Sequence, residues 1–403
     1  MMEMKKYKLG DIAEIIPGYS FKATDFGSGD NIVIKIKDIN PFFVDVASSD
    51  SVSFSPHKKY NVTKGDYVMA MTGATIGKVG MILSDQENIY INQRVCKFIP
   101  DEKICDKLYL FYVLNTDFFR QFVYNNVDSK AAQPNIGHPT LYKFSVQLPP
   151  LPEQKHIASV LSALDKKIAL NKQINQNLEA LTRQLYDYWF VQFDFPNEEG
   201  KPYKSSGGKM VYNPILKREI PEGWDNIKLA ELIRLEDSKR IPLSTYEREN
   251  RKGIYPYYGA TGIMDYIDDY LFDDEIILLA EDGSTSDKKG FPIVQYVWGK
   301  VWVNNHAHII YPRNLNHKIY TYFLLKQIPA KLIETGSIQK KINQDNLLKY
   351  NSIKVPTNIL DDFTKIVSPL WRKKMITTEE ILSLTKQRDE LLPLLMNGQV
   401  SVE

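Results

Sequence analysis

The clearest pattern along the chain is a pair of long helical stretches, one near the middle and one near the end. In each, apolar residues recur at alternating intervals of three and four, which is the spacing of a coiled-coil seam. We expect two long helices that pair with each other. The residues expected to form their seam are Ile157, Leu161, Leu164, Ile168, Leu178, Leu181 and Leu185 in the first helix, and Phe363, Val367, Leu370, Leu384, Leu391 and Leu395 in the second.

Prolines and asparagines interrupt this pattern at a few places. Pro152 suits the first turn of the first helix, where the missing N–H costs nothing. The apolar spacing shifts near Asn171 and Asn175, which predicts a phase slip in the seam. Pro369 and Pro393 lie inside the second stretch. Because proline removes a backbone donor, each of them could kink or interrupt that helix.

The two halves of the chain repeat each other with a period of about 206–212 residues. The run INQRVCKFIP at Ile91–Pro100 returns as VNNHAHIIYP at Val303–Pro312, and Ser145–Pro149 returns as Ser352–Pro356. Each repeat ends at a proline that precedes one of the long helices. The chain is therefore predicted to be two copies of one module, each a globular domain followed by a helix.

The rest of each repeat reads as mixed α and β structure. Strands are predicted at residues 31–36, 67–71, 79–83, 89–98, 276–280, 293–298 and 300–310, and shorter helices at 105–123 and 318–327. Gly, Pro, Ser and Lys are frequent from residue 197 to 223, which is typical of a linker. The predicted fold is α+β, with two pseudo-two-fold-related mixed α/β domains separated by two long antiparallel helices that form a coiled coil. Its expected parts are residues 1–150 (first domain), 151–190 (first helix), 191–223 (linker), 224–357 (second domain) and 358–403 (second helix).

Composition narrows the possible partners and the compartment. The formal net charge is only +2, whereas a protein that grips DNA alone through its phosphates should be clearly basic. If this chain binds DNA, other subunits should supply much of the backbone grip. The two cysteines, Cys96 and Cys105, form no disulfide framework, and no apolar run has the length of a signal or membrane segment. We therefore expect a cytoplasmic protein that does not associate with membranes.

A two-fold repeat of this kind has a mechanical consequence. If a two-fold axis relates the modules, the helices pair antiparallel and the domains lie at opposite ends of the pair. B-DNA has local two-fold axes of its own, and two-fold proteins read half-sites about 34 Å apart. Because the two domains differ strongly in sequence, we expect a split, non-palindromic site with a gap that the helices fix.

The glycine-flanked loop Gly73–Lys78 resembles a phosphate-binding loop. It is one residue shorter than that motif, and Val79 stands where a serine or threonine should bind magnesium. Nucleotide binding is therefore disfavoured. Two interpretations remain: a loop that offers Thr72, Thr75 and Lys78 to DNA, or a purely structural turn.

The sequence gives little sign of catalytic or metal chemistry. His306 and His308 could lie on one face of a strand as metal ligands. Their counterparts in the first repeat are Arg94 and Cys96, so a metal site common to both repeats is not expected. Neither an Asn-Pro-Pro-aromatic methyltransferase motif nor a Gly-x-Gly-x-x-Gly cofactor loop occurs. We expect no catalytic residue, metal or cofactor in this chain.

Polar side chains in the predicted loops are suited to reading base edges. Asn and Gln can bond adenine, Arg and Lys guanine, and Asp or Glu the cytosine amine. For each single residue, a solvated loop position is the alternative. The candidates are Thr72, Thr75, Lys78, Gln93, Arg94, Lys130, Gln133 and Asn135 in the first repeat, and Tyr257, Tyr258, Thr261, Asp282, Ser284, Asn304, Asn305, Gln339, Lys340, Lys341 and Asn343 in the second.

Several segments resemble the specificity subunits of type I restriction–modification systems. The longest is LPPLPEQKHIASVLSALDKKIALNKQIN, which begins at Leu148. The resemblance covers nearly the whole chain, in the order of the family. The other segments are Gly73–Gly80, Gln133–Ile136, Leu185–Pro196, Leu216–Trp224 and Tyr255–Phe272.

This resemblance implies a division of labour in a bacterial or archaeal cytoplasm. The two globular domains would be target recognition domains, each reading one half of a bipartite, asymmetric site on double-stranded DNA. The helices would set the gap and dock two DNA methyltransferase subunits, and restriction subunits would act as motors and nucleases. S-adenosylmethionine, ATP and Mg²⁺ would belong to those partners, so this chain would not be catalytic.

Three other functions are compatible with the sequence. The chain could be the reader subunit of a fused methyltransferase–nuclease of the type IIB/IIG kind. It could be a free-standing enzyme, or a coiled-coil scaffold that binds no DNA.

Overall fold

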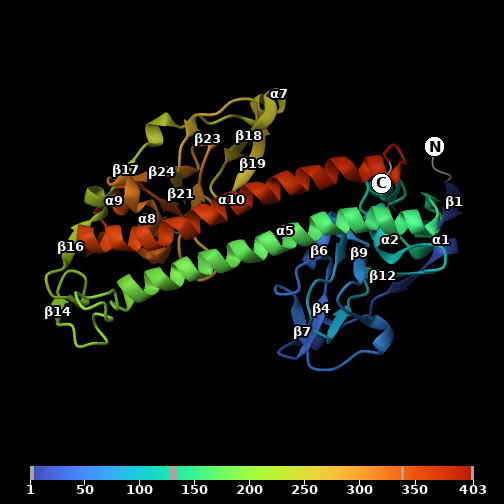
Figure 1. Cartoon of the computed structure of the whole chain (residues 1–403), viewed down its shortest axis with the longest axis horizontal. Coiled ribbons are helices and arrows are strands. Elements are labelled where there is room, and N and C mark those ends of the chain that lie inside the picture. The colour runs from blue at the N-terminus through green and yellow to red at the C-terminus, as the bar shows by residue number, and fades with distance from the viewer. Residues whose placement is uncertain (1–3, 128–133, 337–339, 401–403) are drawn as a thin grey trace. The chain divides into compact units, whose positions relative to one another are not determined.

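The computed structural model describes residues 4–127, 134–336 and 340–400. The chain divides into two compact units: unit 1 comprises Met1–Asn171 and Glu380–Glu403, and unit 2 comprises Lys172–Glu379. Two long helices, α5 (Leu151–Tyr186) and α10 (Thr357–Met396), each contribute one half to each unit (Figure 1). The fold is α+β, as predicted. None of the helices in the described part of the chain has the length and apolar character needed to cross a membrane.

Unit 1 contains two mixed sheets and a two-stranded pair. The strand order in the larger sheet is β2 (Ala13–Pro17), β12 (Val95–Pro100), β9 (Tyr67–Ala70), β10 (Val79–Met81), β6 (Phe42–Val44) and β5 (Ile39–Asn40). The smaller sheet has the order β3 (Phe26–Gly27), β7 (Asp50–Val52), β4 (Asn31–Ile34), β11 (Ile89–Ile91) and β8 (Asn61–Val62). Strand β1 (Lys5–Lys8) pairs antiparallel with β13 (Ser145–Leu148). The short helices are α1 (Leu9–Ile12), α2 (Lys107–Val113), α3 (Asp117–Asn125) and α4 (His138–Leu141).

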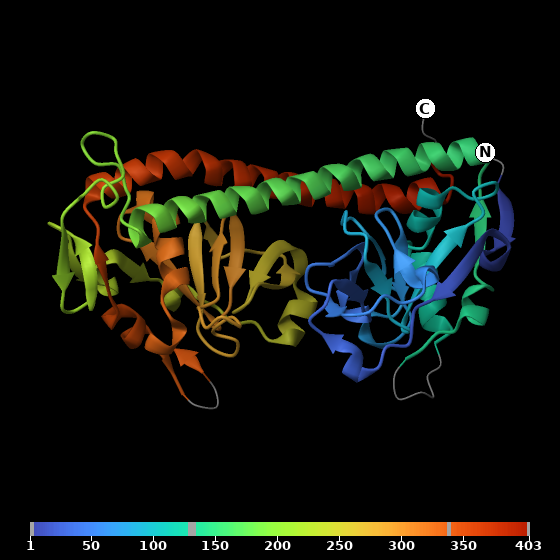
Figure 2. The same ribbon diagram turned by 90° about the horizontal axis from the view of Figure 1, so that it is seen from below.

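The main core of unit 1 joins the larger sheet to the long helices. Tyr67 of β9 and Tyr109 of α2 are fully buried in it. Ile157 and Leu161 of α5 and Leu392 of α10 belong to the same cluster, so the helix pair is part of this core. Figure 2 shows the strands of unit 1, in blue to cyan, beside the N-terminal part of α5. Cys96 and Cys105 are also buried here, where loss of water raises the pKa of both thiols.

Unit 2 repeats this plan with different details. One sheet has the order β17 (Ile233–Leu235), β24 (Ala307–Pro312), β21 (Ile276–Ala280) and β22 (Val294–Val297). The other has the order β19 (Ile263–Ile267), β18 (Lys252–Tyr258), β23 (Lys300–Val303) and β20 (Phe272–Asp273). Three strand pairs complete it: β16 (Asp225–Lys228) with β27 (Asn351–Lys354), β14 (Met210–Asn213) with β15 (Arg218–Pro221), and β25 (Glu334–Thr335) with β26 (Lys341–Ile342). The short helices are α6 (Leu229–Leu232), α7 (Thr245–Asn250), α8 (Lys318–Gln327) and α9 (Gln344–Lys349).

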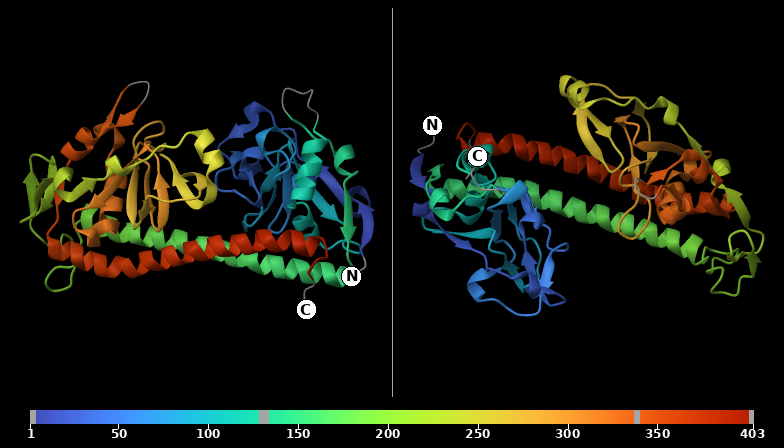
Figure 3. Two further views of the ribbon diagram at one scale, coloured as in Figure 1. Left: turned by 90° about the horizontal axis from the view of Figure 1, so that it is seen from above. Right: turned by 180° about the vertical axis from the view of Figure 1, so that it is seen from behind.

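Aromatic side chains dominate the core where unit 2 meets its part of the helix pair. Tyr186 at the end of α5 packs with Phe323 of α8, and Trp371 of α10 lies against the same ring. Figure 3 shows the yellow and orange strands of unit 2 beside the N-terminal part of α10. The segment 191–223, which we expected to be a linker, carries strands β14 and β15, and its Phe193 and Ile220 are buried in this core. It is a folded part of unit 2, because its aromatic and aliphatic residues find partners there.

Within unit 1, ion pairs show the direction in which α5 and α10 run. Arg388 Nη1 lies 2.9 Å from Asp165 Oδ1, and Lys167 Nζ lies 3.3 Å from Glu380 Oε1. The residue later on α5 is paired with the residue earlier on α10, so the two segments are antiparallel.

Within unit 2, the same direction is seen. Asn175 Nδ2 donates to Thr378 Oγ1 at 2.8 Å, and Lys374 Nζ lies 2.8 Å from Glu179 Oε2. Glu179 also accepts hydrogen bonds from Tyr322 and Lys326 of α8. These contacts hold its pKa below the ordinary value, although burial alone would raise it. Polar contacts therefore take the place of apolar ones in this part of the seam.

The seam differs from its prediction at two places. Leu181 is 43% exposed, and the neighbouring Thr182 is fully buried in its place. Asn171 is buried as well. From Ile157 to Thr182 the inward positions therefore keep the alternating spacing without a phase slip, and Asn171 and Asn175 occupy two of them. Leu164, Leu178, Leu185, Leu370, Leu384 and Leu391 are half-buried, whereas Ile157, Leu161, Ile168, Phe363, Val367 and Leu395 are buried.

Two further features of the elements go beyond the sequence pattern. Helix α10 is not interrupted at Pro369 or Pro393, both of which lie on its exposed side. The runs 89–98 and 300–310 are each two strands, because a turn separates β11 from β12 and β23 from β24. In these turns the side chains of Asn92 and Asn304 accept the N–H two residues later, which bends the backbone.

Candidate functional site

In unit 1, three loops that are distant in sequence meet at one end of the larger sheet. The backbone N–H of Met71 donates to Arg94 O at 2.9 Å, and that of Gly73 donates to Pro134 O at 3.0 Å. Thr72 and Asn135 form a β-bridge. The loop after β9, the β11–β12 turn and residues 134–136 therefore form one surface. Gln93, Arg94 and Asn135 are exposed on it.

The remaining unit 1 candidates are less accessible. Thr75 Oγ1 donates to Ile36 O at 2.9 Å, and Thr72 and Lys78 are half-buried. The Gly73–Lys78 loop is followed by strand β10, not by the helix that a phosphate-binding loop requires. It is a tight turn in which Gly73 and Gly77 have positive φ angles of 77° and 79°. Lys130 and Gln133 lie outside the described residues.

The equivalent loops of unit 2 meet in the same way. Asp282 and Lys341 form a β-bridge, and the N–H of Ile342 donates to Glu281 O at 2.8 Å. The N–H of Glu281 in turn donates to His306 O at 2.9 Å. This surface therefore joins the loop after β21, the β23–β24 turn and the residues around β26. The predicted residues exposed in unit 2 are Thr261, Ser284, Asn305, Lys340 and Lys341, and Asp282 is half-buried.

Some unit 2 candidates have structural roles that the sequence did not reveal. Tyr257 is only 1% exposed, and its hydroxyl accepts the backbone N–H of Leu243 at 2.9 Å. Asn304 is 3% exposed and forms the turn described above. Neither side chain is available to a ligand at the surface, so both are corrections to the predicted site.

Two more candidates are partly engaged by the protein itself. Asn343 caps helix α9, because its Oδ1 accepts the N–H of Asn346 at 2.8 Å. Tyr258 is half-buried, and burial raises the pKa of its hydroxyl to about 12. Gln339 lies outside the described residues.

Equivalent positions in the two surfaces carry different side chains. The buried asparagines Asn92 and Asn304 occupy the same place in the two turns, and they fix the correspondence. The next two positions are Gln93 and Arg94 in unit 1, but Asn305 and His306 in unit 2. The bridging positions differ as well, with Thr72 and Asn135 in unit 1 against Asp282 and Lys341 in unit 2. The two units thus present one backbone arrangement with two sets of functional groups.

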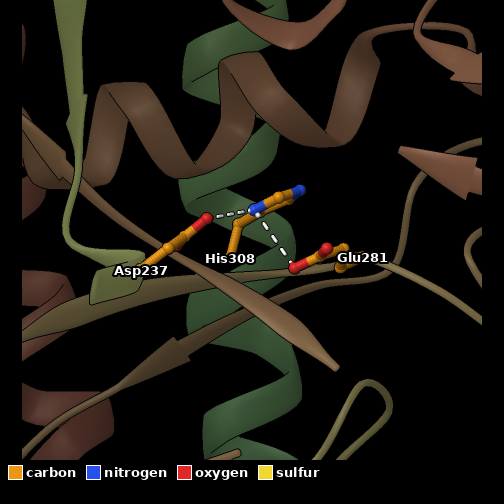
Figure 4. A group of neighbouring side chains, drawn as sticks. All are labelled: Asp237, Glu281 and His308. Carbon is orange, nitrogen blue, oxygen red and sulfur yellow. Dashed lines mark hydrogen bonds and ion pairs between the residues drawn. The ribbon is translucent and has the colours of Figure 1, made fainter. Parts of the chain in front are cut away.

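Beneath the unit 2 surface lies a buried cluster of Asp237, Glu281 and His308 (Figure 4). Asp237 Oδ2 is 2.5 Å from His308 Nδ1, and Glu281 Oε2 is 3.6 Å from the same nitrogen. His308 Nε2 lies 2.7 Å from the carbonyl oxygen of Ile342. Both ring nitrogens of His308 therefore face oxygen atoms of the protein.

Protein groups already satisfy the carboxylates of this cluster. Arg240 and Lys341 bind Glu281 at 2.6 and 2.9 Å, and Gln344 donates to Asp237 at 2.6 Å. Burial would raise the pKa of both carboxyl groups, but the contact of Asp237 with His308 and the bonds from Arg240 and Lys341 to Glu281 hold each pKa below its ordinary value. A metal ion would have to displace these bonds and the contacts of both His308 ring nitrogens. The arrangement is that of an internal ion network.

No local sequence pattern indicates this network, because its members are far apart in the chain. Asp237 follows β17 and lies 71 residues before His308. His306, which we considered with His308, instead points to the surface and bonds Asp282 at 2.7 Å. The two histidines therefore do not share a site.

Relatives of this chain were found by sequence and by structure. The family described as "Type I restriction modification DNA specificity domain" matches residues 1–180 and 221–383. The MjaIX specificity subunit of Methanocaldococcus jannaschii is 28% identical over 98% of this chain and 93% of its own length. The HindI specificity subunit of Haemophilus influenzae is 27% identical over 48% of this chain and 42% of its own length.

The fold agrees with these sequence matches. The crystal structure of the S subunit of a type I restriction–modification system from M. genitalium superposes with a TM-score of 0.59. It is 16% identical in sequence, and the match covers 98% of this chain and 96% of that one. The family match extends over most of both repeats. The chain therefore belongs to the specificity subunits of type I restriction–modification systems.

Proposed function

We propose that this chain selects the DNA site of a type I restriction–modification complex and has no catalytic centre of its own. Each unit reads one half of a bipartite, asymmetric site, and the helix pair sets the gap and docks two methyltransferase subunits. The observation that carries this proposal is the pair of equivalent loop surfaces with unlike side chains. Two copies of one fold with different polar groups are suited to two different half-sites.

The charge of the chain fits such a shared task. A net charge of +2 is small for a protein that neutralises many phosphates by itself. Partner subunits would supply the missing positive charge. They would also carry out the S-adenosylmethionine chemistry and bind ATP and Mg²⁺. Restriction subunits would complete the complex.

A pair of equivalent substitutions tests which unit reads which half. The assay maps methylated adenines across the genome of cells that express the chain with its methyltransferase subunit. We expect Gln93→Ala to relax or change one half-site and Asn305→Ala the other. Gln86→Ala is the matched control, because Gln86 is exposed near the opposite end of β11 and should leave both halves unchanged. Altered recognition of both halves by one substitution would contradict the assignment.

A second experiment tests whether the helix pair sets the gap. One heptad is inserted in α5 within residues 169–177 and another at the facing residues 376–384 of α10. Seven residues add about 10.5 Å of helix, close to three base pairs of B-DNA. We expect both half-sites to be kept and the gap to lengthen. A control variant with the same residues substituted and no change of length should keep the natural gap, and an unchanged gap in the insertion variant would reject this role.

A further inference from the structure

Each unit contains a groove at the C-terminal end of one long helix. In unit 1 the groove has a volume of about 720 Å³ and lies between α2, α3, β13 and the end of α10. In unit 2 a groove of about 520 Å³ lies between α8, β27 and the end of α5. Each groove lies wholly within its own unit.

The two grooves are lined by equivalent positions. Strands β13 and β27 pair antiparallel with β1 and β16, and the N–H of Leu9 donates to Phe144 O as that of Leu229 does to Tyr350 O. Helices α2 and α8 follow the equivalent strands β12 and β24. Tyr109, Val113, Phe144, Leu392 and Met396 in unit 1 correspond to Tyr320, Leu324, Tyr350, Tyr186 and Phe190 in unit 2. The repeat has therefore produced the same concave surface twice.

The unit 2 groove has an additional wall that the chain itself provides. The turn of the β14–β15 hairpin, residues 215–218, lines this groove. Leu216 packs against the unit 2 core, and Arg218 Nη2 donates to Val191 O at 3.2 Å, at the end of the helical segment. The Arg218 guanidinium also lies 4.8 Å from the centre of the Phe193 ring. One apolar side chain and one arginine thus close this side of the groove.

No equivalent turn lines the unit 1 groove among the residues that the structure describes. Instead, Phe118 lies at the groove and is 65% exposed, with its ring centre 5.4 Å from that of the buried Phe144. The end of α10 carries the partial negative charge of a helix C-terminus. Asp117, whose side chain is 96% accessible although Arg120 lies 3.0 Å from it, and Asp389, which pairs with Arg388, add acidic groups beside it, and Lys6 and Arg120 also line the groove. The groove combines apolar side chains with polar groups of both charges, and its acidic groups near the end of α10 could accept a basic side chain placed as Arg218 is in unit 2.

We propose that the unit 1 groove binds a turn of the methyltransferase subunit. The turn presents a leucine-sized side chain that packs on Phe118, Phe144 and Met396. Two residues later, it presents an arginine or lysine toward the end of α10, as Arg218 reaches Val191 O at the end of the helical segment that follows α5. This inference rests on the proposed function, because that function supplies the partner. It makes the two units unequal as docking sites, since the chain itself provides the Leu216 and Arg218 side of the second groove.

Site-specific photocrosslinking in the assembled complex tests the contact directly. The chain carries p-benzoylphenylalanine in place of Phe118 and is mixed with purified methyltransferase subunit. Two positions serve as controls: Leu332, which is 56% exposed in the unit 2 groove, and Tyr124, which is 63% exposed in unit 1 outside the groove. We expect a crosslink to the methyltransferase from position 118 and none from the controls. A crosslink from 118 to a second copy of this chain, or to nothing, would overturn the proposal.

Affinity measurements separate this contact from the function on which it rests. We expect Phe118→Ser to raise the Kd for the methyltransferase subunit at least tenfold, and Asp117→Lys to raise it as well through repulsion of the basic residue. Tyr124→Ser and Leu332→Ser should change the Kd by less than twofold, and thermal unfolding checks that all variants are folded. An unchanged Kd for Phe118→Ser, with normal binding by the natural chain, would reject the groove alone. Failure of the natural chain to bind the methyltransferase would reject the proposed function too.

Discussion

The ion pair between Asp165 and Arg388 offers a quantitative test of how α10 is held to unit 1. The side chain of Arg388 is 9% exposed and that of Asp165 is 24% exposed. Tyr112 donates to the other oxygen of Asp165 at 2.7 Å, and the Arg388 guanidinium lies 3.6 Å from the centre of the Phe42 ring. Asp389 bonds the same guanidinium at 2.8 Å and remains as a partner when Asp165 is changed.

These contacts set the expected magnitude. Breaking a fully buried pair costs about 3–5 kcal/mol, and a hydrogen bond to a charged group contributes about 1.5–3 kcal/mol. Because Asp389 compensates in part, we expect Asp165→Asn to lower the free energy of unfolding by about 2 kcal/mol. Arg388→Met keeps an apolar contact with Phe42 and should cost about 2–3 kcal/mol. In the double variant the two losses should not add, with a coupling energy of about 1.5 kcal/mol.

The assay is denaturant unfolding of the full chain, followed by two signals. All five tryptophans lie between Trp189 and Trp371, within unit 2, so their fluorescence reports that unit. Hydrogen exchange in residues 151–171 and 380–396 reports the helix pair in unit 1. We expect the substitutions to increase hydrogen exchange in these helix segments before they change the tryptophan fluorescence of unit 2. A coupling energy below about 0.5 kcal/mol would refute the view that Asp165 and Arg388 act as a pair.

Three further predictions concern the seam, the ion network and the turns. Ile168→Ala should lower the free energy of unfolding by about 2–4 kcal/mol and Leu181→Ser by less than about 0.5 kcal/mol, as measured by denaturant unfolding, because only Ile168 is buried. Folding depresses the pKa of Asp237 and Glu281, so their ionised forms stabilise the chain above about pH 4 and this contribution is lost as the pH falls through their folded pKa values. The Tm of Asp237→Asn should therefore be well below that of the natural chain at pH 7, and the difference in Tm should narrow toward pH 3. A difference in Tm that stays constant with pH would contradict the linkage. Asn92→Ala should cost about 1–2 kcal/mol and disturb only the half-site read by unit 1, whereas Asn304→Ala should disturb only the other, as methylation mapping would show.

The long helices could be predicted from the sequence because their signal is local. An apolar stripe with intervals of three and four needs no tertiary information. The polar part of the seam gives no such signal, since Asn171 and Thr182 resemble surface residues of a helix. Their burial depends on the facing helix, about 200 residues away in the chain, so the local pattern favours Leu181 over Thr182 as the buried residue.

The candidate site was predictable in outline for a different reason. The repeat aligns Gln93 with Asn305, so the two exposed turns could be found by comparing one half of the chain with the other. Side-chain direction within the loops could not be found in this way. Tyr257 is buried because a backbone N–H at Leu243 satisfies its hydroxyl, and that partner is set by tertiary structure. The same holds for the Asp237–His308 contact.

The polar bonds of the seam in unit 2 have a consequence for how the helices can slide. Asn175 meets Thr378, and four residues later Glu179 meets Lys374. If one helix moved along the other by a single turn, each of these groups would lose its partner on the facing helix, and Lys374 would be left without its carboxylate in a partly dry interface, where such a loss is expensive. Leucine at all four positions would hold the helices together more strongly, but it would accept several alignments almost equally well. The natural residues hold the helices together less strongly than leucine would, but they favour a single alignment.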